Sequence, residues 1–203
     1  PFYVYHVTVS KGYEHDFSGA GLPSPPASLW PFLRCILHIF FCAKGSWQMM
    51  GLDLNNLIST DDIEKLTPGG AARDILNLNL YSLGLVCDDD AFRARLNAAS
   101  FVHFDGVGAA ILYRVFSGVW FSPAGYREWA LRYLESRPEG TKFLAIGGTD
   151  EESRSFVKSM QSMMPHLAVA AIDGYEDLNT LTEFFDEKKP DICFVVMGMP
   201  LQE

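Results

Sequence analysis

Apolar and polar residues alternate in blocks along residues 51–203, and the blocks predict strands that alternate with helices. Short apolar runs at Phe101–Phe104 and 142–146 are bounded by polar residues and glycines, as is typical of buried strands. Apolar residues at helical spacing fill the intervals, for example over 125–134 and 178–185. Because strands that alternate with helices indicate βαβ units, we predict an α/β protein with a mostly parallel, Rossmann-like sheet and helices on both faces.

The same pattern places the other expected elements. Further strands are expected to end within 75–80 and to span 167–172 and 191–197, and further helices to lie around Ile63, from Asp88 through Leu96, over 107–116 and up to Met164.

Residues 1–50 lack this pattern. They are rich in proline and glycine, and their apolar run at 29–43 is shorter than the roughly 20 residues of a membrane span. Arg34 and His38 interrupt that run. We expect an irregular N-terminal segment of unknown role, with an interfacial helix as the alternative, and a separate domain at 51–203. Since the chain starts at Pro1 and stops on a motif, we also expect it to be a piece of a longer protein.

Composition excludes some classes of protein. The net charge is −9 and 48% of the residues are hydrophobic, which argues against a nucleic-acid binder and provides for a sizeable core. The four cysteines form no C-x-x-C pair, so we expect reduced thiols in a cytoplasmic protein. The five histidines show no zinc-binding spacing.

Asp105 and the glycines after it are the first candidate site. Gly106 and Gly108 follow a predicted strand, and a glycine there permits a tight turn and close approach of a ligand. The N–H groups at the start of the next helix can bind an anion such as phosphate. Asp105 would then be a general base in a cleft. The alternative is an ordinary helix cap with Asp105 as the N-cap residue.

Polar groups also follow other predicted strands. Gly147 and Gly148 form a second strand–glycine–helix junction, which suits a nucleotide phosphate or ribose, and Gly174 with Tyr175 forms a weaker third. Asn77 and Asn79 are two apart and therefore point the same way in a strand. Their amides can bind sugar hydroxyls or a diphosphate, or can simply form turns.

The run Asp88–Asp90 is a candidate for a divalent metal beside a nucleotide. Acidic residues are favoured at a helix start in any case. We therefore expect no metal site and no cofactor.

Six segments, taken in order, resemble one family. They are Asn77-Leu-Asn79, Asp105-Gly-Val-Gly108, Pro123-Ala-Gly125, Phe143–Gly148, Asp173-Gly-Tyr175 and Gly198-Met-Pro-Leu-Gln-Glu203. Over roughly residues 52–203 the chain is similar to the WecG/TagA/CpsF glycosyltransferases. These bacterial enzymes transfer a sugar, such as N-acetylmannosamine or its uronate, from a UDP donor to a polyprenyl-diphosphate-linked acceptor.

The resemblance implies an inverting, metal-independent glycosyltransferase of cell-envelope polysaccharide synthesis, as in teichoic acid or exopolysaccharide assembly. Asp105 matches the catalytic base, which deprotonates the acceptor hydroxyl. It also implies peripheral contact with the cytoplasmic face of the bacterial plasma membrane, and leaves a homo-oligomer possible. Residues 51–203 would be the glycosyltransferase domain, continuing beyond Glu203. The residues expected to bind substrate are Asn77, Asn79, Gly106, Gly108, Gly125, Gly147, Gly148, Gly174, Tyr175, Gly198, Pro200, Gln202 and Glu203.

Two departures keep other functions open. Asn77 stands where the family usually has threonine, and Ser122 stands where an arginine is expected before the Ala-Gly pair. A lost guanidinium would remove a bidentate phosphate contact. The alternatives are a non-catalytic or decayed nucleotide-binding relative and another Rossmann-like nucleotide-dependent enzyme.

Overall fold

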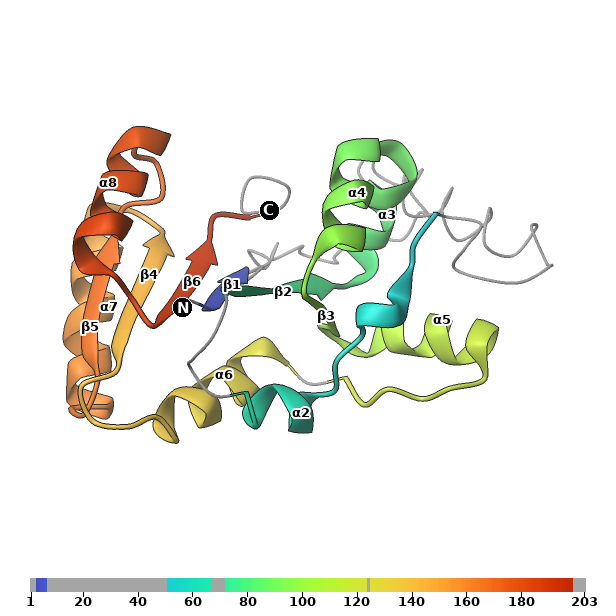
Figure 1. Cartoon of the computed structure of the whole chain (residues 1–203), viewed down its shortest axis with the longest axis horizontal. Coiled ribbons are helices and arrows are strands. Elements are labelled where there is room, and N and C mark those ends of the chain that lie inside the picture. Colours follow the sequence, from blue (N-terminus) through green and yellow to red (C-terminus); the bar gives the residue numbers. More distant parts are fainter. Residues whose placement is uncertain (1–2, 7–50, 67–71, 124, 199–203) are drawn as a thin grey trace, which may run out of the picture.

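The computed structural model describes residues 3–6, 51–66, 72–123 and 125–198, which form one sheet with helices on both faces (Figure 1). The sheet has the strand order β3-β2-β1-β6-β4-β5, and every pair of neighbouring strands is parallel. The predicted α/β fold with a parallel, Rossmann-like sheet is therefore confirmed. The strands are β1 (Tyr3–His6), β2 (Arg73–Leu78), β3 (Phe101–Phe104), β4 (Lys142–Gly147), β5 (Ala168–Ile172) and β6 (Ile192–Val196).

The expected strands lie close to their predicted positions, because each is a short apolar run; β2, β3, β4 and β6 are mostly buried, whereas the edge strand β5 is only partly buried. Residues 3–6 are the exception. They were predicted to belong to an irregular segment outside the domain, but they form β1 in the middle of the sheet. Tyr3 pairs with Arg73 of β2 on one side and with Ile192 of β6 on the other. Four residues are too short a run to stand out from the surrounding sequence. The apolar run at 29–43 lies outside the described residues.

The described helices follow the strands as expected, and most begin at a side-chain cap. Asn79, Asp89, Thr149 and Asp177 cap α3, α4, α7 and α8 respectively. Such caps satisfy N–H groups that have no partner within the helix. The helices are η3 (Leu54–Asn56), α2 (Thr60–Glu64), α3 (Leu80–Asp88), α4 (Asp90–Ala98), α5 (Val107–Ser117), α6 (Tyr126–Glu135), α7 (Asp150–Met163) and α8 (Leu178–Lys188).

Alternate residues of the strands face two helical layers. One face packs against α2, α6 and α7 through a cluster that includes Trp129, Tyr133 and Phe143. The other face packs against α3, α4 and α5 at one end and against α8 at the other. None of the helices in the described part of the chain is both long and apolar enough to cross a bilayer.

The strand order sets where a ligand can bind. The chain runs outward from β1 through β2 to β3, then crosses to β4 and β5 on the other side and returns to β6. In such doubly wound sheets, ligands bind outside the carboxyl ends of the strands where the winding reverses. Those predicted site residues that the structure describes lie at or just after the carboxyl ends of β2, β3, β4, β5 and β6, so they share this edge, with the exception of Gly125, which follows α5.

Candidate active site

Asp105 lies at the carboxyl end of β3 and is half-buried. Its backbone N–H donates to the carbonyl of Leu78, the last residue of β2, over 3.2 Å. Gly106 is the N-cap residue of α5, with φ of +85°, a conformation that favours glycine. The alternative interpretation of Asp105 as the N-cap residue is therefore wrong. The carboxylate is left at the mouth of a strand–helix junction.

The start of α5 carries no side-chain cap. The same is true of α6, whose N-cap residue is Gly125. These two differ from the other described helices, whose first N–H groups are met by side chains. A helix start with available N–H groups and a favourable dipole is suited to an anion. The first turn of α5 is thus the best-placed anion-binding group next to Asp105.

Gly108 has a structural role. A Cβ atom at this position would lie 2.5 Å from Cδ1 of Leu80, so any larger residue would push α5 away from the start of α3. By contrast, a Cβ atom at Gly106 would meet nothing within 4 Å. Gly108 therefore sets the distance between the two helix starts, and Gly106 leaves open space beside Asp105.

The two asparagines have different surroundings. Asn77 lies within β2, is only 1% exposed and pairs in register with His103 of β3. Asn79 caps α3: its Oδ1 accepts from the N–H of Ser82 over 2.9 Å, and the Ser82 hydroxyl accepts from the N–H of Asn79. The alternative interpretation of Asn79 was a turn formed through its side chain, and the structure shows a helix cap instead. The cap uses the amide oxygen and leaves the amide NH₂ as the group of Asn79 that can face a ligand.

His103 lies within β3, two residues before Asp105 in the chain. It is 1% exposed, its Nε2 lies 3.2 Å from the hydroxyl of Thr60, and its ring contacts Trp129 edge-on. Burial lowers the pKa of His103 to about 4, because a charged imidazolium would lose its hydration. A neutral His103 therefore ties α2 and α6 to the end of β3.

The carboxyl ends of β4, β5 and β6 meet at glycines. A Cβ atom at Gly147 would lie 2.3 Å from the carbonyl oxygen of Val196, and one at Gly174 would lie 2.7 Å from Cα of Gly147. The N–H of Gly174 also donates to the carbonyl of Gly148 over 3.1 Å. Gly147 and Gly174 are thus needed so that three loops can approach each other, and Gly148, with φ of +71°, turns the chain into α7.

Carboxylates already occupy the start of α7. Glu152 accepts from the N–H of Thr149 over 2.8 Å, and Asp173 accepts from the N–H of Asp150 over 3.1 Å. A phosphate bound at these N–H groups would lie next to the two carboxylates, and the like charges would repel each other. Hydroxyl groups, by contrast, can donate to such carboxylates. Of the two ligands predicted for this junction, ribose fits better than phosphate.

A cavity of about 640 Å³ adjoins this junction. Gly147, Gly148, Glu152 and Ser153 line one part of it, and apolar side chains of α6, α7 and the strands line the rest. Neither this cavity nor the two carboxylates at α7 were predicted to belong to the site. The acidic first turn at 150–152 was the available signal for the carboxylates, whereas the cavity depends on packing between distant helices.

The predicted site therefore consists of two groups on one edge. Asn77, Asn79 and Asp105 lie at β2 and β3, and the glycine junction lies at β4, β5 and β6. Strands are about 4.8 Å apart, so β3 and β6, which are three strands apart, are separated by roughly 14 Å. Gly198 and the exposed Tyr175 belong to the second group. Pro200, Gln202 and Glu203 lie outside the described residues.

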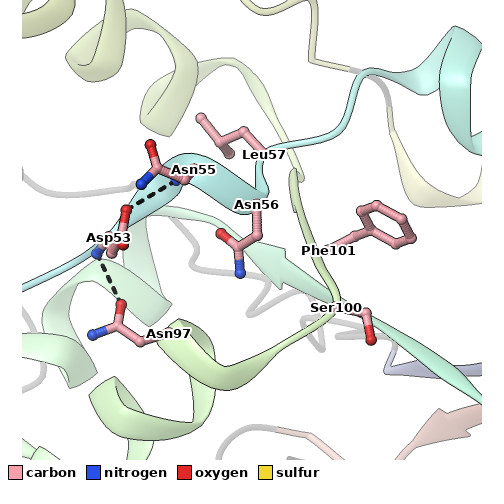
Figure 2. Close-up of a pocket in the computed structure, with 7 residues that line it drawn as sticks. All are labelled: Asp53, Asn55, Asn56, Leu57, Asn97, Ser100 and Phe101. Atoms are coloured by element: carbon pink, nitrogen blue, oxygen red, sulfur yellow. Dashed lines mark hydrogen bonds between the residues drawn. The ribbon is translucent and has the colours of Figure 1, made fainter.

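A small polar pocket lies at the opposite, amino end of β3, and Figure 2 shows the residues that line it. Most of its polar groups form hydrogen bonds within the protein. The N–H of Asp53 donates to Oδ1 of Asn97, and the amide of Asn56 donates to the carbonyls of Leu96 and Ala99. These hydrogen bonds hold η3 against the end of α4, and the pocket lies away from the candidate site.

The aspartate run serves helix structure. Asp88 ends α3, Asp89 caps α4 by accepting from the N–H of Phe92, and Asp90 pairs with Arg93. Within the described ranges, no group of three histidine, cysteine or acidic side chains is arranged to hold a metal ion.

Comparison with known proteins agrees with the predicted resemblance. The chain is similar to N-acetylglucosaminyldiphosphoundecaprenol N-acetyl-beta-D-mannosaminyltransferase of Staphylococcus aureus (strain MRSA252), with 23% identity over 167 residues that cover 76% of this chain and 64% of the relative. The chain thus spans less than two thirds of that relative's length. A family model described as "Glycosyl transferase WecG/TagA/CpsF family" matches residues 47–203. Because this match covers most of the chain, the protein belongs to the WecG/TagA/CpsF family of glycosyl transferases.

Proposed function

We propose that this protein is an inverting glycosyltransferase that moves a sugar from a UDP-sugar to a polyprenyl-diphosphate-linked acceptor. The donor sugar is taken to be an N-acetylhexosamine, in line with the name of the relative. The reaction serves cell-envelope polysaccharide synthesis at the cytoplasmic face of the plasma membrane. The observation that carries the proposal is the position of Asp105, half-buried at a strand end beside the uncapped start of α5.

The chemistry requires one base and one anion-stabilising group. Asp105 accepts the proton of the acceptor hydroxyl as its oxygen attacks the anomeric carbon of the donor. The bond between that carbon and the β-phosphate oxygen breaks, and UDP leaves with the bonding electrons. A single displacement inverts the anomeric centre.

Charge that develops on the diphosphate needs stabilisation. The N–H groups at the start of α5, and those at the start of α6, can supply it without a metal ion. The carboxylates at the start of α7 suit the ribose of the donor, and the amide NH₂ of Asn79 suits a sugar hydroxyl. The donor would therefore extend along the carboxyl edge from the glycine junction toward Asp105.

A transfer assay tests the proposal. The full-length protein is incubated with a panel of UDP-sugars, a short-chain polyprenyl diphosphate carrying N-acetylglucosamine, and EDTA. Mass spectrometry should show one added hexosamine, and NMR should show an anomeric configuration opposite to that of the donor. Transfer that requires a divalent metal, or retention of configuration, would contradict the mechanism.

Ser122 favours a second candidate, a relative that binds nucleotide without transferring sugar. Ser122 is exposed and stands where the family resemblance leads one to expect arginine, so a phosphate contact would be missing. Binding of UDP by a protein that transfers no sugar from any UDP-sugar would favour this candidate.

A further inference from the structure

A row of apolar side chains on α5 faces away from the core. Val107, Ile111 and Val115 are four residues apart and thus share one side of the helix. They are 56%, 48% and 64% exposed, although the opposite side of α5 is buried through Ala109 and Ala110. Val119 and Trp120, in the loop that follows, are 49% and 50% exposed. We call these five residues the α5 ridge.

The loop that carries the end of the ridge is held in place. Gly118 ends α5 in the left-handed conformation, and the N–H of Val119 donates to the hydroxyl of Ser117 over 3.0 Å. The ring of Phe121 packs edge-on against Tyr113 of α5 and Phe104 of β3. Val119 and Trp120 are therefore held outward by anchored neighbours. An apolar surface built in this way marks an interaction site.

The charge of the segment indicates the class of partner. Residues 106–125 contain no aspartate, glutamate, lysine or histidine, and Arg114 is their single charged residue, in a chain with 25 acidic residues and a net charge of −9. Most of such a chain would be repelled by an anionic bilayer. Apolar residues with a tryptophan and an arginine, free of acid, are suited to the lipid–water interface.

The ridge is too small to form a stable dimer interface by itself. A standard protein interface draws roughly 20–30 residues from each partner, whereas the ridge has five. In Figure 1, α5 lies at the far end of the molecule from α7 and α8.

We propose that the α5 ridge docks the protein on an anionic phospholipid bilayer. The inference rests on the proposed function, because a lipid-linked acceptor has its diphosphate at the bilayer surface. The ridge begins at Val107, two residues after Asp105, so docking brings the base to the level at which that acceptor is presented. Trp120 and the valines enter the interfacial layer, and Arg114 stays near the lipid phosphates.

Vesicle binding tests the proposal independently of catalysis. The protein is sedimented with vesicles of phosphatidylglycerol and phosphatidylcholine, and the double variant Ile111→Asp with Val115→Asp is compared with the wild type. We expect the variant's partition coefficient to fall about tenfold or more. The control Leu178→Asp, which changes an even more exposed apolar residue at the start of α8, should bind as the wild type does.

A milder variant guards against loss of folding. Ile111→Ser with Val115→Ser should weaken vesicle binding in the same direction while the thermal unfolding curve stays unchanged. Brominated lipid should quench the fluorescence of the wild type more strongly than that of Trp120→Phe. Wild-type binding by the aspartate variant, or no binding of the wild type to anionic vesicles, would overturn the proposal. So would an oligomer that the aspartate variant dissociates while vesicle binding persists.

A catalytic comparison separates this proposal from the proposed function. With a water-soluble, short-chain acceptor the aspartate variant should transfer sugar as fast as the wild type, and with acceptor embedded in vesicles it should be slower. If the wild type transfers no sugar to the soluble acceptor, the proposed function fails while the vesicle result stands. Equal loss on both acceptors would overturn the docking role.

Discussion

Asp105 and His103 show how neighbouring positions on one strand take different roles. His103 lies within β3, and Asp105 directly follows the last residue of that strand. His103 is fully buried and neutral, whereas Asp105 sits where the strand leaves the sheet. Burial therefore makes the histidine a structural link between layers and leaves the aspartate accessible for chemistry.

The buried His103 predicts a pH dependence of stability. As the pH falls from 6.5 to about 4, the unfolded chain protonates this histidine and the folded protein does not, so the free energy of unfolding decreases. The full loss is about 3 kcal/mol and is absent above pH 6.5. Urea unfolding between pH 7 and pH 4.5 measures most of this loss.

The variant His103→Gln should lose this contribution and so show a shallower decline over that range. His166→Gln is the matched control and should decline as the wild type does. The same slope in His103→Gln and the wild type would show that His103 is not the group responsible.

Individual residues could be predicted from the sequence only in part. Asp105 was found because a carboxylate followed by glycine stands out after an apolar run. A turn was the open alternative for Asn79, which the structure shows to be a helix cap. The buried link of His103 to Thr60 and Trp129 was not predictable. These contacts join residues 26 to 43 positions apart, and no local pattern encodes such pairs.

At the scale of elements, glycines set the distances between strand ends and helix starts. Gly147 allows Val196 to approach, and Gly108 allows α5 to lie against α3. The sequence marked both as ligand-binding glycines, and their close contacts give each a packing role that holds whether or not a ligand touches it.

Two glycine substitutions should have opposite effects. Gly147→Ala should destabilise the protein by about 2 kcal/mol or more, because the new Cβ clashes with a backbone carbonyl and φ is positive. Gly84→Ala, within α3 where a Cβ meets nothing within 4 Å, should stabilise it by up to about 1 kcal/mol. Thermal unfolding measures both. A Gly147→Ala protein as stable as the wild type would refute the close approach.

Elements themselves were largely predictable. Phe101–Phe104 was predicted as a strand with the bounds that the structure has, and the predicted helix at 125–134 is shifted by one residue from α6. β1 was missed because its four residues carry little periodicity and gain their partners from distant β2 and β6. Sheet order is likewise set by long-range pairing.

At the scale of the whole molecule, the proposed donor lies across one edge of a parallel sheet and the proposed bilayer lies beside α5. The two groups of site residues are contributed by strands on either side of β1. A ligand that touches both groups should therefore bind the folded protein and not the unfolded chain, and so stabilise the whole fold.

UDP should raise the thermal stability of the protein. At a UDP concentration 100 times its dissociation constant, the gain is about 2.7 kcal/mol. Differential scanning calorimetry with UDP, and with NAD as the matched nucleotide control, measures it. Stabilisation by NAD and not by UDP would instead indicate another Rossmann-like nucleotide-dependent enzyme.

The most direct test of the central claim is the transfer rate of Asp105→Asn with a UDP-sugar and the polyprenyl-diphosphate acceptor. The control is Asp88→Asn, which changes an exposed carboxylate at the end of α3. We predict that Asp105→Asn folds, binds UDP and transfers sugar about 10²- to 10⁴-fold more slowly, while Asp88→Asn keeps the wild-type rate. Near-wild-type transfer by Asp105→Asn would contradict the assignment of Asp105 as the base.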